Sequence, residues 1–143
     1  MNKERMIETH MQTAELYAGM SRGIRAKVGC VIVTESGVLL PGYNGTPKGF
    51  DNALETVDTD TGEFVTKPTV IHAELNCVMK AAREGISVRN ARVFVTHSCC
   101  VPCAAMLVQA GVDQVYYRQV YKNDDGIKVL REGGIFTKLV EKQ

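Results

Sequence analysis

Three side chains that bind transition metals, and one acid beside them, carry the strongest chemical signal in this 143-residue sequence. His72 and Glu74 lie in a His-Ala-Glu run, and Cys100 and Cys103 form a Cys-x-x-Cys pair further along the chain. One imidazole and two thiolates suit a tetrahedral zinc whose fourth position stays open for water, as in catalytic sites and unlike closed structural ones. The sequence therefore predicts one catalytic zinc per chain, with His72, Cys100 and Cys103 as ligands.

Glu74 stands two residues beyond the histidine, where a proton carrier for that water is needed. Zinc lowers the pKa of its bound water to about 7, and the resulting hydroxide can attack the amine-bearing carbon of a cytosine-like ring. A carboxylate can then carry the proton to the ring nitrogen and on to the leaving ammonia. His-x-Glu followed by Pro-Cys-x-x-Cys is the pattern of zinc-dependent nucleobase deaminases. Glu74 is the predicted catalytic residue.

The cysteine motif departs from that pattern at one position. Cys99 occupies the place where the pattern has proline, and Pro102 lies inside the cysteine pair. Cys99 could in principle replace Cys100 as a ligand, but the Cys-x-x-Cys spacing, which places two sulfurs on one turn, favours Cys100. The other two of the five cysteines, Cys30 and Cys77, are expected to be small buried hydrophobic residues, and no disulfide framework is expected.

Composition and charge indicate a single globular domain over residues 1–143. Hydrophobic residues make up 45% and charged residues 23% of the chain, which is an ordinary balance. The net charge of +1 argues against a polynucleotide partner, although a few local charges could still hold a small anion. The sequence shows neither a membrane-length apolar run nor a signal peptide, so we expect no membrane partner and a cytoplasmic location.

The spacing of apolar residues predicts helices that alternate with strands. We expect helices over about residues 3–19, 70–84, 100–110 and 123–133, and strands over about residues 28–34, 38–43, 92–96, 114–117 and 135–139. The first two strands should form an antiparallel hairpin, and helical crossovers should make later strands parallel. Residues 42–70, rich in glycine and proline, are predicted to be mostly irregular. The expected fold is α/β, with a mixed five-stranded sheet and helices on both faces.

Several further stretches of the chain resemble the deoxycytidylate (dCMP) deaminases of the cytidine deaminase superfamily. They are residues 25–29, 42–49, 72–76 and 100–103 with 109–112, then Tyr117 and Tyr121, and last Gly126-Ile127 and Gly133-Gly134-Ile135. The likeness extends from about residue 6 to about residue 140. The zinc motif alone indicates only the superfamily, whereas the Gly-Tyr-Asn-Gly-x-Pro-x-Gly run at residues 42–49 points to dCMP.

This resemblance implies a three-layer α/β/α cytidine deaminase-like fold and the hydrolytic deamination of dCMP to dUMP and ammonia, which supplies dUMP for dTTP synthesis. It also implies that the substrate contacts are Arg25, Asn44, Ala73 and Tyr121. Among these, Asn44 matches a residue near the sugar, and Arg25 and Tyr121 match positions at the 5′-phosphate.

Members of this family are often hexamers that are activated by dCTP and inhibited by dTTP with Mg²⁺. The resemblance therefore implies a homo-oligomer, a hexamer, with an effector pocket built from Arg22, Lys27, Gly42, Tyr43, Asn44, Gly45 and Lys48. The cations at residues 22, 25 and 27 could clamp a phosphate, although without the zinc motif an ordinary solvated loop would be the favoured explanation. Since residues 43–70 contain no cysteine or histidine, no second zinc is expected.

Other functions are compatible with the same residues. A related deaminase could act on dCTP or on cytidine, and a nucleotide-binding regulator could keep the zinc for structure alone. Glu74 argues against the regulator, because a structural zinc site does not require a carboxylate at that position. A tRNA adenosine deaminase would favour a basic RNA-binding surface, which the net charge does not supply. His97 lies close to the cysteine pair but has no role in the family pattern.

Overall fold

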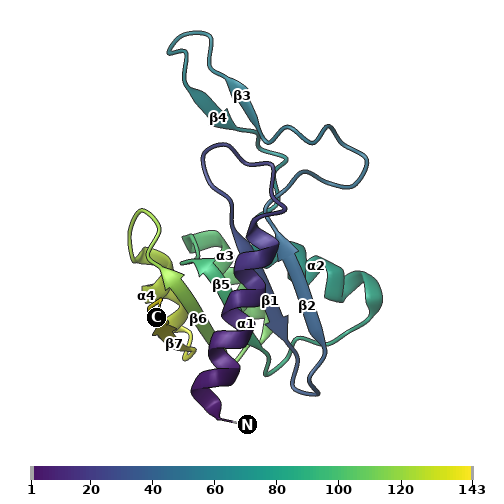
Figure 1. Ribbon diagram of the computed structural model, residues 1–143, viewed down its shortest axis with the longest axis vertical. Coiled ribbons are helices and arrows are strands. Elements are labelled where there is room, and N and C mark those ends of the chain that lie inside the picture. The colour runs from purple at the N-terminus through teal and green to yellow at the C-terminus, as the bar shows by residue number, and fades with distance from the viewer. Residues whose placement is uncertain (1, 143) are drawn as a thin grey trace.

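A five-stranded sheet forms the centre of the computed structural model, which describes residues 2–142 (Figure 1). In spatial order its strands are β2 (Leu39–Tyr43), β1 (Gly29–Val33), β5 (Arg92–His97), β6 (Gln114–Gln119) and β7 (Phe136–Leu139). Strand β1 runs antiparallel to both β2 and β5, whereas β5, β6 and β7 run parallel to one another. The predicted mixed sheet is confirmed.

Helices cover both faces of this sheet. They are α1 (Lys3–Ala18), α2 (Ala73–Glu84), α3 (Val101–Ala110) and α4 (Asp125–Glu132). On one face, α1 packs its apolar side against Val31, Val33, Phe94 and Tyr116. On the other face, α2, α3 and α4 pack against Cys30, Ile32, Val93 and Val95. Successive strand residues point to opposite faces, so the unbroken apolar runs of β1 and β5 serve both layers. The expected three-layer arrangement is confirmed.

The two cysteines outside the Cys99–Cys103 region belong to the core, as the sequence predicts. Cys30 on β1 and Cys77 on α2 are both fully buried, and all five cysteines of the chain are free thiols in the structure. The Cys77 thiol donates a hydrogen bond to the Cys30 carbonyl oxygen at 3.5 Å. These two residues therefore help to pack α2 onto the sheet.

Helices α2 and α3 begin and end in the same way. Each begins at an N-cap residue with extended backbone, His72 for α2 and Cys100 for α3. Each ends at a glycine in the left-handed region, Gly85 with φ 68° and Gly111 with φ 84°, as the sequence predicts. The expected helix over residues 100–110 agrees with α3, which begins at Val101 with Cys100 as its N-cap, so Ser98 does not cap it. The Ser98 hydroxyl accepts a hydrogen bond from the Tyr121 N–H instead.

A small hairpin lies within residues 42–70, where the sequence analysis expected mostly irregular chain. Strands β3 (Glu55–Val57) and β4 (Phe64–Thr66) pair antiparallel as a separate two-stranded sheet that projects away from the main sheet (Figure 1). Its turn uses Gly62 at φ 73°, with the Gly62 N–H donating to the Asp58 carbonyl oxygen at 2.7 Å. Three-residue strands between glycines and prolines leave too short a pattern to predict from sequence.

Within residues 2–142, no helix combines the length and the apolar character needed to cross a bilayer.

Gly42 on β2 permits the close approach of α2 to the sheet, which leads to a test of its role. A Cβ atom at residue 42 would lie 2.9 Å from the Cys77 sulfur and 3.1 Å from the Ala73 carbonyl oxygen. We expect Gly42→Ala to lower the free energy of unfolding by about 1–3 kcal/mol, the usual cost of overpacking. Gly45→Ala is the control, because a Cβ there would come no closer than 3.9 Å to the Tyr43 ring. Urea unfolding measures both variants, and equal stability would contradict the packing role.

Candidate active site

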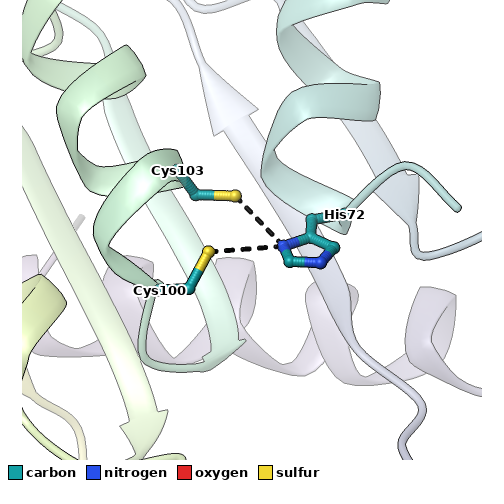
Figure 2. A group of neighbouring side chains, drawn as sticks. All are labelled: His72, Cys100 and Cys103. Atoms are coloured by element: carbon teal, nitrogen blue, oxygen red, sulfur yellow. Dashed lines mark hydrogen bonds between the residues drawn. The ribbon is translucent and has the colours of Figure 1, made fainter. Parts of the chain in front are cut away.

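The three predicted metal ligands lie together at the N-terminal ends of two helices (Figure 2). His72 is the N-cap of α2, Cys100 is the N-cap of α3, and Cys103 follows in the first turn of α3. The imidazole Nδ1 is 3.2 Å from the Cys103 sulfur and 3.5 Å from the Cys100 sulfur. Among the described residues these three side chains form a group whose ligand atoms all lie within 4.8 Å of one another.

The geometry of this group fits zinc. Zinc–sulfur bonds of about 2.3 Å and zinc–nitrogen bonds of about 2.0 Å at tetrahedral angles separate nitrogen from sulfur by about 3.5 Å. The two nitrogen–sulfur distances of 3.2 and 3.5 Å are close to that separation, and Nδ1 faces both sulfurs. One imidazole and two thiolates are also the donor set of known catalytic zinc sites. The residues present can therefore hold zinc with one coordination position left for water.

The electrostatics of the group favour a thiolate before any metal binds. Hydrogen bonds with the Cys103 thiol and with His72 lower the pKa of Cys100 to about 4. The pKa of Cys103 is raised, first because it shares its proton with Cys100 and then by burial. The hydrogen bond with Cys100 raises the pKa of His72. The positive ends of α2 and α3 add to this field, and a bound divalent cation would displace the remaining thiol proton.

Glu74 lies in the first turn of α2 and is almost completely buried, with 4% of its surface exposed. Burial raises the pKa of its carboxyl group, while its own backbone N–H and the Cys99 thiol oppose that shift by hydrogen bonding. A carboxyl whose pKa is moved upward toward neutrality is suited to exchange protons with a substrate. The arrangement agrees with the role that the sequence predicts for Glu74.

Cys99 contacts a different partner from its neighbour Cys100. Its side chain is buried, and its pKa is raised by burial and then by the negative charge of Glu74. The group of three metal-binding side chains contains Cys100 and not Cys99. The geometry therefore favours the register that the Cys-x-x-Cys spacing suggests, with Cys99 beside the Glu74 carboxylate.

A cavity of about 390 Å³ opens onto these residues. His72, Glu74 and Cys100 line it, and so do all four residues that the resemblance assigns to substrate: Arg25, Asn44, Ala73 and Tyr121. Its volume lies in the range of small-molecule sites. Residues far apart in the sequence thus meet around one space next to the zinc ligands.

Asn44 also has a structural role that the sequence did not reveal. Its Oδ1 accepts a hydrogen bond from the Val28 N–H at 2.9 Å, and its Nδ2 donates to the Ala26 carbonyl oxygen at 3.0 Å. These two bonds brace the loop between α1 and β1, which carries Arg25. Asn44 therefore shapes the cavity wall as well as lining it.

The other residues assigned to an effector pocket do not line this cavity. They are Arg22, Lys27, Gly42, Tyr43, Gly45 and Lys48. The three cations are exposed, Gly45 exchanges two backbone hydrogen bonds with Ile71, and the Tyr43 carbonyl oxygen accepts from the Asn76 amide at 2.7 Å. Structural contacts account for the glycines and for the Tyr43 backbone. Their place in an effector site stays a prediction.

The sequence analysis missed several residues that line the cavity, notably Glu55 and Thr66 of the hairpin, His97 and Lys122. The sequence analysis noted that His97 lies close to the cysteine pair, three residues before Cys100, but gave it no role. Burial lowers the pKa of His97, and the Gln119 amide donates to its Nε2 at 2.9 Å, so the ring is held neutral. The hairpin residues and Lys122 belong to no motif and gave no signal.

Comparisons with known proteins agree with this site. Residues 4–119 match the family described as the cytidine and deoxycytidylate deaminase zinc-binding region. A deoxycytidylate deaminase of Saccharomyces cerevisiae is 35% identical over 87% of this chain and 41% of its own length. The deoxycytidylate deaminase of Enterobacteria phage T4 is 30% identical over 89% of this chain and 86% of its own. The chain thus spans about two fifths of the yeast protein.

A solved structure gives the same result in three dimensions. The dCMP deaminase of the cyanophage S-TIM5, in complex with dCMP and dUMP, superimposes with a TM-score of 0.86. It shares 42% identity, and the match covers 97% of this chain and 99% of that one. This chain belongs to the cytidine and deoxycytidylate deaminase family. The predicted family and fold are confirmed.

Three serine variants test the ligand register. We expect Cys100→Ser and Cys103→Ser to lose most of the bound zinc, because each removes one of the three ligand atoms that face one another. Cys99→Ser should keep its zinc, because Cys99 lies against Glu74 instead. Emission spectroscopy of the purified proteins gives the zinc content per chain. Zinc loss from the Cys99 variant together with retention in the Cys100 variant would reverse the assignment.

Proposed function

We propose that this protein, acting as a single domain, catalyses the hydrolytic deamination of dCMP to dUMP and ammonia. The observation that carries the proposal is the shared cavity. It brings the His72, Cys100 and Cys103 group and the buried Glu74 together with Arg25 and Tyr121, an arginine and a phenol suited to a phosphate. The likeness to the cyanophage enzyme, whose structure is a complex with dCMP and dUMP, supports the same substrate.

The chemistry divides between the metal and the chain. A zinc ion held by His72, Cys100 and Cys103 would supply a Lewis acid that lowers the pKa of water near neutral pH. Glu74 moves two protons in turn: it carries the first from the attacking water to the pyrimidine ring nitrogen, and the second from the resulting hydroxyl group to the amine. The carbon–nitrogen bond then breaks, ammonia leaves, and the carbonyl of dUMP remains. Burial favours the first of these steps, because it raises the pKa of the Glu74 carboxyl and so makes the carboxylate a stronger base toward the water proton.

Substrate recognition is the role we propose for the remaining cavity residues. Arg25 can donate paired hydrogen bonds to a phosphate, and the Tyr121 hydroxyl can donate another. Asn44 and Ala73 also line the cavity, and we infer that they contact the sugar and the base. A ligand anchored at both ends presents its amine-bearing carbon to the metal site in one orientation.

Regulation and assembly form a further part of the proposal. We infer a homo-oligomer, a hexamer, that responds to dCTP as activator and to dTTP with Mg²⁺ as inhibitor, and that supplies dUMP for dTTP synthesis. The support is the Gly-Tyr-Asn-Gly-x-Pro-x-Gly run at residues 42–49 and three exposed cations, Arg22, Lys27 and Lys48. Opposed effects require that the two nucleotides prefer different conformations of the protein. A cytoplasmic location stays a prediction.

One assay tests the proposed reaction. Ammonia release is measured on dCMP, CMP, cytidine and dCTP, with and without added dCTP or dTTP and Mg²⁺. We expect dCMP to give the highest kcat/KM of the four compounds. The Glu74→Gln variant should keep its zinc, but its turnover of dCMP should fall by about 10²–10⁴-fold. Near-normal turnover by the zinc-loaded Glu74→Gln protein would contradict the mechanism. A higher kcat/KM on cytidine or on dCTP than on dCMP would show that the preferred substrate is that compound and not dCMP.

A further inference from the structure

The base of the β3–β4 hairpin borders the cavity and is anchored there. Glu55 on β3 and Thr66 on β4 are directly opposite each other in the hairpin, and both line the cavity. Leu54, just before β3, is buried and also lines it, and its carbonyl oxygen accepts a hydrogen bond from the Lys67 N–H at 2.8 Å. One cross-strand pair of the projecting hairpin is thus fixed at the wall of the substrate space.

This pair contacts Arg25, the residue for which we propose a contact with the phosphate. Glu55 Oε2 accepts two backbone hydrogen bonds, from the Ile24 N–H at 2.8 Å and from the Arg25 N–H at 3.0 Å. The Thr66 hydroxyl accepts a third, from the Arg25 Nη1 at 3.4 Å. Two residues that lie 30 and 41 positions further along the chain therefore hold Arg25 at both its backbone and its guanidinium group. Figure 1 shows the loop between α1 and β1 reaching the foot of the hairpin.

Arg25 needs such support, because within residues 2–142 its side chain makes no other hydrogen bond and no ion pair. It is exposed and lies in an irregular loop between α1 and β1, so its long side chain is free to sample many rotamers. Asn44 braces this loop after Arg25, through its bonds to residues 26 and 28. The hairpin holds the same loop at residues 24 and 25, through the hydrogen bonds to Glu55. The Thr66 hydroxyl takes up one edge of the planar guanidinium and leaves other N–H groups for a bidentate contact.

We propose that Glu55 and Thr66 are positioning residues that aim Arg25 at the 5′-phosphate, so that the hairpin sets the affinity for a phosphorylated substrate. This inference rests on the proposed function, because it assigns the same site a means of holding its phosphate end. Neither residue takes part in the chemistry at the zinc ligands. Their loss therefore raises KM for dCMP and leaves kcat largely in place.

A double-mutant cycle tests this coupling. Thr66→Val removes the hydroxyl from an exposed strand position and keeps the β-branched shape, so folding is preserved. We expect about a threefold to tenfold rise in KM for dCMP and in Kd for dUMP, the usual weight of one hydrogen bond. Thr66→Ser should restore both values. In an Arg25→Ala background Thr66→Val should change neither value further, because its effect passes through the guanidinium.

Two further variants complete the experiment. Thr56→Val is the matched control, because Thr56 lies on the same hairpin opposite Val65 and not opposite a cavity residue. It should leave KM unchanged. Glu55→Ala should raise KM for dCMP, and Glu55→Gln, which keeps an acceptor oxygen for the two N–H groups, should recover most of the loss.

The outcomes separate this inference from the function on which it rests. If the wild-type protein does not convert dCMP, the proposed function fails. If it does, and Thr66→Val leaves KM and Kd unchanged or has the same effect with and without Arg25, only the positioning role is overturned. A fall in kcat without a rise in KM would also overturn it, because that pattern would place the hairpin in the chemical step.

Discussion

The close approach of two helix N-termini is the constraint on which the rest of this site depends. His72 and Cys100 are the N-caps of α2 and α3, and neither side chain accepts a capping hydrogen bond from its own helix. A serine or aspartate cap would stabilise each helix by about 1 kcal/mol, so these positions give up some stability for chemistry. Leaving both side chains uncapped lets them turn toward each other across the gap between the helices (Figure 2).

Two glycines allow the starts of α2 and α3 to pack closely against neighbouring segments of the chain. Gly42 lets α2 approach β2, and Gly126 lets the first turn of α4 approach the chain that enters α3, where a Cβ would lie 3.1 Å from the Cys100 carbonyl carbon. A larger side chain at either glycine would displace a helix start, and with it a metal ligand. The glycine run around residue 42 therefore serves packing in this fold, whatever further role it has in binding an effector.

Much of this arrangement could be predicted from short stretches of sequence, whereas the parts that depend on contacts between distant residues could not. The zinc ligands and Glu74 could be predicted because they fall in short motifs at helix starts, and the sheet because its strands are continuous apolar runs. The β3–β4 hairpin could not, since its strands are three residues long and its placement depends on contacts of Glu55 and Thr66 with a loop some 30 to 40 residues earlier. The bracing role of Asn44 was missed for the same reason. A motif match shows that a residue is needed, but it does not show which backbone groups its amide binds.

The most direct test of this account is the coordination of the metal itself. X-ray absorption at the zinc edge of the purified protein reports the number and type of atoms around the ion. The account predicts two sulfur ligands at about 2.3 Å, with one imidazole nitrogen and one further light atom at about 2.0–2.1 Å. A first shell of three sulfurs, with Cys99 added to the group, would close the site and contradict a catalytic role for the metal.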